Sequence, residues 1–451
     1  VRERLVRDAL TYLDTLATDA AGDVSLQREL AAAYMRVGRV QGELTAASMG
    51  NTEAALASYR KGVAILEHAL RTDSTDADTR RALAESATDL AALIWRTGDL
   101  AGGLALTQRA RAVLEPLIAA QPSDSALRLE VNRVYSQLGS LLLETGDLTE
   151  ALAVKQRAAD LVDSAVARRP GSVRLRRDLA IALQGVGDVE TQLHGPAAAL
   201  PAFRRSREIS EILAAENGGS VDLQRLLSVA LYWEGETLAL MNRHAEALPL
   251  FQRSVGIGEA LAAADTAMSR SDLDFGYLRV GDMLARLGRE PEALTYYRRT
   301  VESRRQQVAG DPDNLWTRLA LLESTTRVCR TLAVQDPGAA RATCAEARDL
   351  AVGTSVDTTS AADLGYMGGA FSELGDAYER LASAPRTSAP ERAQAQTAAH
   401  AMHTRSHRIW SDLARRGVIS PVDTPRVALA RAAVERTAQL EVAASVSQGR
   451  R

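Results

Sequence analysis

The fold is decided by residues 127–158, which read LRLEVNRVYSQLGSLLLETGDLTEALAVKQRA. Apolar side chains at positions 127, 131, 134, 138 and 142 recur every three or four residues, as they do along one face of a helix. The turn residues Thr145-Gly146-Asp147 interrupt this pattern, and a second helical pattern follows them. The stretch therefore predicts two antiparallel helices joined by a short turn.

The same arrangement recurs about every 48 residues, and two series of small residues mark its register. The first series has spacings of 48, 48, 48, 46, 48 and 46 and consists of Ala91, Gly139, Gly187, Gly235, Gly281, Cys329 and Gly375. The second series keeps a spacing of 48 four times and then 46, and consists of Ala55, Gly103, Ala151, Ala199, Ala247 and Ala293. Glycine costs a helix interior about 1 kcal/mol relative to alanine, so its recurrence indicates that two helices cross closely there. We expect helices of roughly 20 residues, each about 30 Å long.

One unit of this repeat resembles the tetratricopeptide repeat. The matching residues are Tyr135, Leu138-Gly139, Leu142, Gly146, Ala151 and Ala158, and similar runs begin at Tyr277 and Phe371. The resemblance implies an all-α fold, a right-handed superhelix of about seven helix hairpins. This chain departs from the family in the length of the repeat, because the family's repeat has about 34 residues and both helices are longer here.

The expected organisation has four parts. Residues 1–23 hold a lone N-terminal helix at 1–20, and residues 24–390 hold the repeats. Residues 391–445 form closing helices near 391–416 and 425–445, and residues 446–451 are a frayed tail. Insertions at 41–50 and 383–390 lengthen two loops.

Stretches near both ends resemble the region after the catalytic domain in bacterial transmembrane serine/threonine protein kinases. These stretches are residues 5–14, 26–34, 55–61 and 409–413. The resemblance implies that the chain is the sensory or docking arm of a larger signalling kinase, on the periplasmic side of a membrane, with the cytoplasm as the alternative. The chain contains no Val-Ala-x-Lys, His-Arg-Asp or Asp-Phe-Gly motif, so we expect this segment not to be an enzyme. Ala389-Pro390-Glu391 matches a kinase motif by letters alone, and we interpret it as a helix cap.

Composition excludes several classes of protein. The net charge of −3 gives no general attraction to nucleic acid or anionic lipid, and no run of 18 apolar residues predicts a membrane span. Two cysteines exclude a disulfide framework. A turn near 335–337 lies midway between Cys329 and Cys344, so a disulfide is geometrically conceivable. Because the register position alone explains the small side chain of Cys329, we interpret it as a packing residue, with the disulfide as the alternative.

His400, His403 and His407 stand three and four residues apart, so their rings could share one helix face as metal ligands do. The apolar stripe of that helix is Met402, Ile409 and Leu413, away from the histidines, and no carboxylate or thiol joins them at ligand spacing. We therefore interpret them as a solvated histidine face, with a metal site as the alternative. No cofactor is expected.

The residue after each small residue faces the concave groove in tetratricopeptide arrays. Here these residues are Asp188, Glu236, Asp282 and Asp376, where the family's carboxylate clamp would carry Lys and Asn. We therefore expect a protein or peptide partner that is cationic or neutral. The candidate groove residues are Arg133, Ser136, Gln184, Asp188, Tyr232, Glu236, Asp282 and Asp376. The alternative for the carboxylates is that they pair with arginines of the chain such as Arg279 or Arg286. Two functions remain beside partner binding, namely passive oligomerisation and a metal-binding helical protein.

Overall fold

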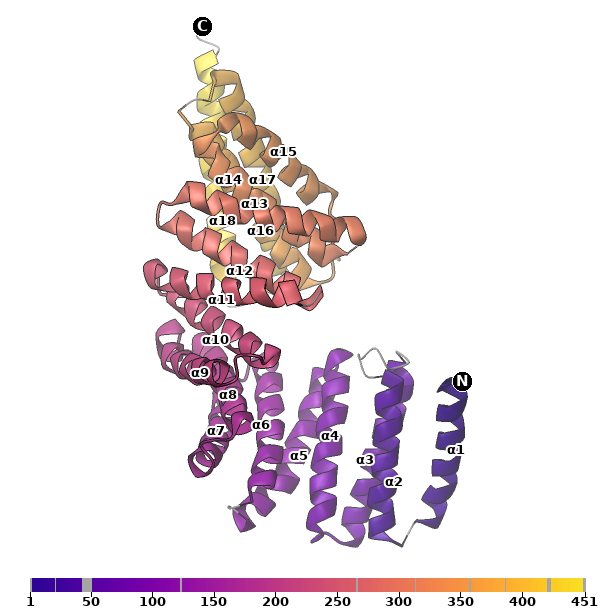
Figure 1. The fold of residues 1–451 in the computed structure, drawn as a ribbon. Helices are drawn as coiled ribbons and strands as arrows, with labels where there is room; N and C mark the ends of the chain where they lie inside the picture. The colour runs from indigo at the N-terminus through magenta and orange to yellow at the C-terminus, as the bar shows by residue number, and fades with distance from the viewer. Residues whose placement is uncertain are drawn as a thin grey trace. The chain divides into compact units, whose positions relative to one another are not determined.

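A computed structural model describes residues 2–20, 22–42, 51–121, 124–264, 267–312, 314–356, 358–385, 387–419 and 423–448. These described residues form eighteen α-helices and no strand (Figure 1). The helices recur as hairpins, so the chain has the all-α helical-repeat fold that the sequence predicts. The chain divides into two compact units, residues 1–241 and residues 242–451.

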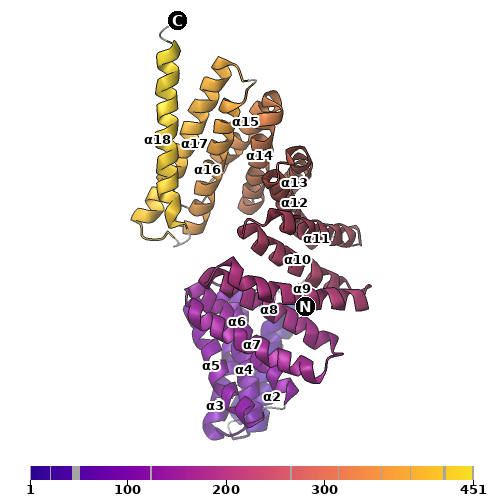
Figure 2. The same cartoon turned by 90° about the vertical axis from the view of Figure 1, so that its left-hand side faces the viewer.

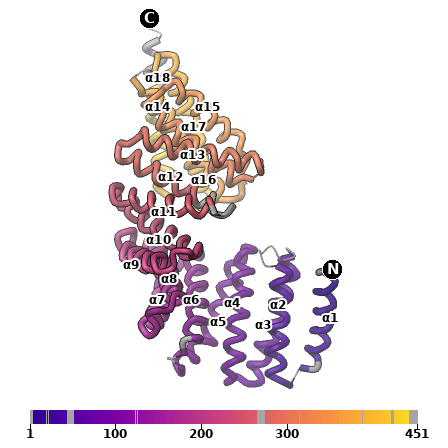
Figure 3. The backbone as a smooth tube through the Cα atoms, in the orientation of Figure 1, coloured from indigo at the N-terminus to yellow at the C-terminus, as the bar shows by residue number. Residues whose placement is uncertain are grey.

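The first unit holds a leading helix, four hairpins and one further helix. Its helices are α1 (Arg2–Asp19), α2 (Val24–Gly42), α3 (Thr52–Thr72), α4 (Ala77–Arg96), α5 (Leu100–Ala120), α6 (Ser125–Thr145), α7 (Leu148–Arg168), α8 (Val173–Leu193), α9 (Pro196–Glu216) and α10 (Val221–Leu240). The hairpins pair α2 with α3, α4 with α5, α6 with α7 and α8 with α9. Figure 3 traces this succession along the chain. Of the insertion expected at 41–50, residues 43–50 lie outside the described residues.

The second unit holds three hairpins between two further helices. Its helices are α11 (His244–Ala264), α12 (Ala267–Arg286), α13 (Glu290–Gly310), α14 (Leu315–Gln335), α15 (Pro337–Gly353), α16 (Ala361–Ser383), α17 (Ala389–Arg415) and α18 (Thr424–Gln448). The helices expected near 391–416 and 425–445 are α17 and α18, and α17 pairs with α16 before α18 packs on α17 (Figure 2). Of the tail expected at 446–451, residues 446–448 belong to α18 and 449–451 lie outside the described residues.

Capping residues set the helix ends. Asp147 begins α7 by accepting a hydrogen bond from the backbone N–H of Glu150 at 3.1 Å. The preceding Gly146 has φ +83°, a left-handed conformation that favours glycine after a helix. Ser388 and Glu391 form a capping box at the start of α17. Ala389-Pro390-Glu391 therefore begins a helix, as we interpreted from the sequence.

The first series of small residues lies where the two helices of a hairpin cross. A Cβ atom added to Gly187 would lie 2.7 Å from the ring of Phe203, and one added to Gly139 would lie 2.7 Å from Cγ of Lys155. Each covering side chain comes 16 residues later, from the second helix of the same hairpin. This close approach is the reason for small residues that the sequence analysis predicted.

The histidine interpretation was wrong for His403. The ring of His403 is fully buried and lies against Gly375, so it fills the same kind of place as Phe203 in its hairpin. Its Nε2 lies 2.8 Å from Glu379 Oε1. His400 instead contacts Thr437 at 3.0 Å, and His407 contacts Ser411 at 3.3 Å. The three rings therefore do not meet around one ligand. α17 packs against both α16 and α18, so it buries a wider face than its apolar stripe indicated.

Cys329 and Cys344 form a disulfide that joins α14 to α15. Both side chains are fully buried, and their Cα atoms lie 5.0 Å apart. The disulfide that the sequence analysis held as the alternative is therefore the arrangement in the structure, and Cys329 also keeps its small-residue place in the register.

Candidate functional site

The first helices of the hairpins in the first unit lie next to one another. α4 contacts α6, α6 contacts α8, and α8 contacts α10 (Figure 1). We call the side formed by these helices the first-helix face. Six predicted groove residues lie on these helices, namely Arg133 and Ser136 on α6, Gln184 and Asp188 on α8, and Tyr232 and Glu236 on α10. Ser136, Gln184 and Tyr232 occupy one position of the 48-residue repeat, and Asp188 and Glu236 occupy another.

On α6 the predicted residues take part in contacts within the unit. Arg133 Nη1 donates to Asp89 Oδ1 at 3.0 Å, and burial raises the pKa of Asp89 against the opposing effect of Arg133. The carbonyl of Ser136 accepts a hydrogen bond from Lys155 Nζ at 2.8 Å. These two residues therefore support the first-helix face as well as line it.

On α8 the two predicted residues face side chains from the second helices. Gln184 Nε2 donates to Ser206 Oγ at 3.1 Å. Burial lowers the pKa of Lys155, and the nearby charge of Asp188 opposes that shift. The carboxylate of Asp188 is therefore already compensated in part by an ammonium group of the chain.

On α10 an exposed aromatic side chain accompanies the predicted residues. Tyr232 lies edge-on to Trp233 with 5.6 Å between ring centroids, and Glu236 is half-buried. Trp233 also stacks on Phe203, with centroids 6.0 Å apart and an interplanar angle of 11°. Despite these contacts 38% of Trp233 remains exposed.

This face also carries an apolar strip that we did not predict from the sequence, and we define it as Ile181, Val229 and Trp233. Their exposed fractions are 45%, 37% and 38%. Ile181 and Val229 stand 48 residues apart, so they occupy the same position of consecutive repeats. Apolar residues with the repeat's period, but off the buried stripe, were a signal that could have revealed the strip.

The two predicted groove residues of the second unit are held by internal partners. Asp282 accepts from Arg327 Nε at 2.9 Å and from the Tyr297 hydroxyl at 2.8 Å, and Arg279 lies 3.7 Å away. Burial would raise the pKa of Asp282, but the charge of Arg327 and these hydrogen bonds outweigh burial and lower it. The alternative of pairing with arginines is therefore confirmed for Asp282.

Asp376 belongs to a cluster with His403 and Glu379. Burial raises the pKa of Asp376 against the opposing effect of His403, whose Nε2 lies 3.7 Å from Asp376 Oδ1. These three residues are the one group in the described chain whose ligand atoms lie close enough to hold a metal ion. However, Arg436 already donates to both oxygens of Glu379, at 2.8 and 3.1 Å. A cation would have to displace that guanidinium, so the arrangement favours an internal ion network.

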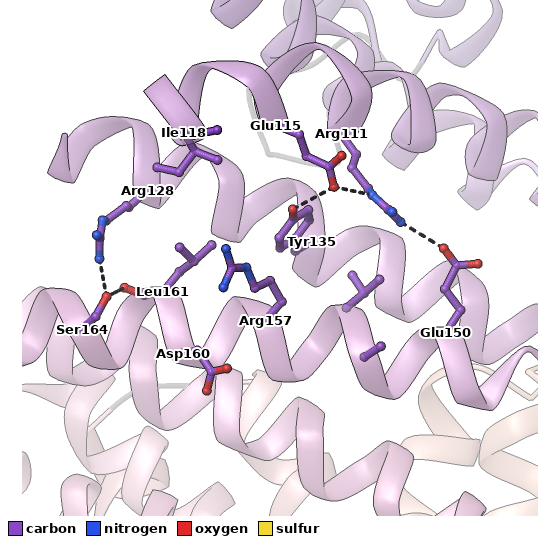
Figure 4. A pocket seen from close by; sticks show the side chains of 13 residues that line it. Arg111, Glu115, Ile118, Arg128, Tyr135, Glu150, Arg157, Asp160, Leu161 and Ser164 are labelled. Carbon is purple, nitrogen blue, oxygen red and sulfur yellow. Dashed lines mark hydrogen bonds and ion pairs between the residues drawn. The ribbon is translucent and has the colours of Figure 1, made fainter. Parts of the chain in front are cut away.

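A separate pocket of about 740 Å³ opens between the second helices α5 and α7 and is also lined by α6. We call it the second-helix pocket. Figure 4 shows Arg111 linking Glu115 to Glu150 at one end, while Arg128 binds Ser164 at the other. Arg157 projects between the two ends. We predicted no site at these residues from the sequence.

Across the described residues, none of the helices combines the length and apolar character that crossing a membrane requires. The sequence matches no known family model, and it matches no curated protein.

Solved structures with related folds include a signal transduction ATPase with numerous domains and a tetratricopeptide repeat sensor, from Pyrococcus horikoshii. It is 10% identical with a TM-score of 0.50, over 87% of this chain and 54% of that chain. BtubC from P. vanneervenii is 18% identical with a TM-score of 0.45, over 57% of this chain and 92% of that chain. A Rap protein complexed with competence and sporulation factor is 10% identical with a TM-score of 0.42, over 94% of this chain and 99% of that chain. At these identities the likeness concerns architecture, and the first of these structures shows that the chain has the fold of a tetratricopeptide-repeat array.

Proposed function

We propose that the chain is a protein-binding module whose first unit holds a polypeptide segment of another protein on the first-helix face of α8 and α10. The observation that carries this proposal is the exposed apolar strip of Ile181, Val229 and Trp233. Contiguous exposed apolar surface on a soluble fold commonly marks a binding site.

Trp233 suits the role of an anchor. Its stacking on Phe203 holds the ring in one orientation while leaving 38% of it exposed. A ring that is already held loses little conformational freedom when a partner packs on it. Tryptophan is also among the residues that most often dominate the binding energy of protein interfaces.

The charge preference that we propose is for a neutral or cationic segment. Asp188 and Glu236 occupy equivalent positions on α8 and α10, the two helices that carry the strip. Lys155 offsets the charge of Asp188 in part, so we expect the preference for a cation to be moderate.

Fluorescence anisotropy with labelled peptides tests this function on the full chain. A Leu-Arg-Leu-Arg-Leu peptide should bind, and Trp233→Ala should weaken that binding about 30-fold, as expected for a residue worth about 2 kcal/mol. Ile212→Ala is the matched control, because Ile212 is 52% exposed on α9 and lies outside the strip. Equal weakening by both variants, or no binding by the wild-type chain at millimolar peptide, would contradict the proposal.

We further propose that the chain is the sensory or docking arm of a serine/threonine protein kinase and that it binds its partner in that role. The support is the resemblance of residues 5–14 and 409–413 to such proteins. The sequence encoded upstream of Val1 tests this parentage. A catalytic domain with a His-Arg-Asp motif followed by about 20 apolar residues would support it and would favour the periplasmic location. An upstream sequence without a kinase domain would remove it.

Passive oligomerisation is the second candidate function, because Leu240 near the end of α10 is 55% exposed. Sedimentation of the purified chain over a hundredfold range of concentration distinguishes the two. A monomer that binds the peptide supports partner recognition, whereas a stable oligomer that binds none supports assembly.

A further inference from the structure

Consecutive hairpins of the first unit are joined by ion pairs between their second helices. Lys61, Arg109, Arg157 and Arg205 follow one another at intervals of 48 residues, and so do Glu67, Glu115 and Asp163. Arg109 on α5 pairs with Glu67 on α3 at 2.9 Å, and Arg205 on α9 pairs with Asp163 on α7 at 2.7 Å. We call the side of the unit formed by the second helices of its hairpins the second-helix face, and we call these equivalent ion pairs its rungs.

Similar contacts, with the acid in a shifted position in the case of Asp14, join other helices of the chain. Lys61 on α3 pairs with Asp14 on α1 at 2.6 Å. In the second unit, Arg299 on α13 pairs with Glu259 on α11 at 3.3 Å. A basic residue that reaches an acid on the preceding second helix is therefore a regular feature of this fold.

The rung between Arg157 and Glu115 is not formed. Glu115 Oε1 instead accepts from Arg111 Nε at 2.8 Å and from the Tyr135 hydroxyl at 3.1 Å. Arg111 is held in turn by Glu150 at 2.9 Å. Within the part of the chain that the structure describes, Arg157 makes no hydrogen bond or ion pair, and Figure 4 shows its guanidinium beside Tyr135 in the second-helix pocket.

The pocket at this open rung combines an apolar wall with a guanidinium group that has no ion-pair partner among the described residues. Its charged lining is balanced, with Arg111, Arg128 and Arg157 against Glu115, Glu150 and Asp160. Arg128 lies at the other end of the pocket, where burial lowers its pKa, as do the charges of Arg168 and Arg157. Since Arg157 makes no ion pair in the described part of the chain, it is the group in the lining to which an anion would be attracted, beside the other guanidinium groups. Val154, Leu161 and Ile118 supply apolar lining next to them. An inorganic ion would leave that lining uncovered, whereas an acidic residue flanked by aliphatic residues would cover it.

We propose that the second-helix pocket binds an acidic side chain of a partner polypeptide, whose carboxylate completes the open rung with Arg157 while a neighbouring aliphatic side chain packs on Val154 and Leu161. The site is distinct from the first-helix face and takes a partner of opposite charge. It therefore does not depend on the function proposed above.

Anisotropy measurements on the full chain with a labelled Leu-Glu-Leu-Glu-Leu peptide and its Leu-Gln-Leu-Gln-Leu counterpart test this proposal. The acidic peptide should bind about tenfold more tightly, as expected for one charge-assisted pair. Arg157→Ala should abolish that preference. Arg205→Ala is the matched control and should retain it, because Arg205 is similarly placed but already paired with Asp163. Trp233→Ala should have no effect, which separates this site from the first-helix face.

Three results would overturn the proposal. The first is equal binding of the two peptides to the wild-type chain, which includes no binding of either. The second is equal loss of preference in Arg157→Ala and Arg205→Ala, because the attraction would then be general. The third is inorganic phosphate alone binding as tightly as the acidic peptide with the same dependence on Arg157. The pocket would then recognise a small anion and not a polypeptide.

Discussion

Tyr297 lies across Gly281, so that a Cβ atom on Gly281 would be 2.5 Å from the ring and no side chain larger than hydrogen fits without movement. The tyrosine hydroxyl then donates to Asp282, the next residue of α12. One contact between two helices thus places both a packing residue and a predicted groove residue.

This contact predicts that Gly281→Ala destabilises the second unit. Overpacking costs about 1–3 kcal/mol, more than the gain of about 1 kcal/mol in helix propensity. Gly256→Ala is the matched control, because Gly256 lies inside α11 with no atom within 4 Å of the added Cβ. It should stabilise by up to about 1 kcal/mol. Urea unfolding of the two variants measures the difference, and equal shifts of the same sign would contradict the packing account.

His403 should tolerate replacement by phenylalanine but not by alanine. Phenylalanine places a somewhat larger flat ring against Gly375, and Nδ1 of His403 is buried without a hydrogen-bond partner, so the loss of that nitrogen costs little. Glu379 keeps Arg436 as its partner. We expect a change below about 1.5 kcal/mol for His403→Phe and a loss of about 3 kcal/mol for His403→Ala, which leaves a cavity.

Thermal melts with and without zinc chloride extend this comparison. If His403 serves packing, zinc should leave the melting temperature of both the wild type and His403→Phe unchanged. Stabilisation of the wild type alone would instead indicate the metal site.

Asp282→Asn should destabilise the second unit by about 3 kcal/mol at neutral pH. The substitution removes one carboxylate partner of the buried Arg327, but Arg327 keeps Glu323 at 3.1 Å and Glu373 at 3.6 Å. The expected loss of stability is therefore at the low end of the range for breaking a buried ion pair. The folded-state pKa of Asp282 is lowered, so its contribution is present above the unfolded pKa of about 3.9 and is lost as pH falls through the folded pKa.

Denaturant unfolding of the wild type and Asp282→Asn at several pH values checks both statements. The difference in stability should be constant from pH 7 to pH 5 and should shrink below about pH 4. Glu292→Gln, which alters an exposed pair with Arg289, serves as the control and should leave stability unchanged. A difference that grows on acidification would contradict the assignment.

Reduction of the disulfide should lower the stability of the second unit. Cys329 and Cys344 are separated by 15 residues, and closing a loop of that length is worth about 3 kcal/mol in the chain-entropy account. Denaturant unfolding with and without dithiothreitol measures the effect. Cys344→Ala should already be destabilised and should not respond to the reductant. A wild type that does not respond either would indicate that the thiols are unbonded in solution.

The period of small residues predicted the fold because it reflects a local rule, namely that two helices of a hairpin cross where one of them carries no bulk. The covering positions were equally readable, since Lys155 and Phe203 stand 48 residues apart and each follows its glycine by 16. That spacing does not lead to His403, because His403 follows Gly375 by 28 residues and the residue 16 positions after Gly375 is Glu391. The apolar stripe of α17 could not reveal the buried place of His403 either, because it does not indicate that the helix packs on two neighbours.

The ion-pair partners of the groove residues were harder to predict, because they depend on where the charged groups at the ends of long side chains lie in space. Arg327 follows Asp282 by 45 residues and reaches it only because α12 and α14 lie in adjacent hairpins of the second unit. For Glu115 the sequence offers two partners, Arg111 four residues earlier on the same helix and Arg157 at the equivalent rung position, and it does not rank them. The repeat therefore predicts which residues are neighbours, whereas the geometry of the side chains decides which of those neighbours bond.

The choice made by Glu115 has a practical consequence for engineering such chains. Two consecutive hairpins can acquire a recognition pocket without any change to the period of the repeat when one carboxylate is diverted from its counterpart in the next hairpin. Placing an arginine and a tyrosine at the positions equivalent to Arg111 and the buried Tyr135 in two other consecutive hairpins should therefore create the same pocket there.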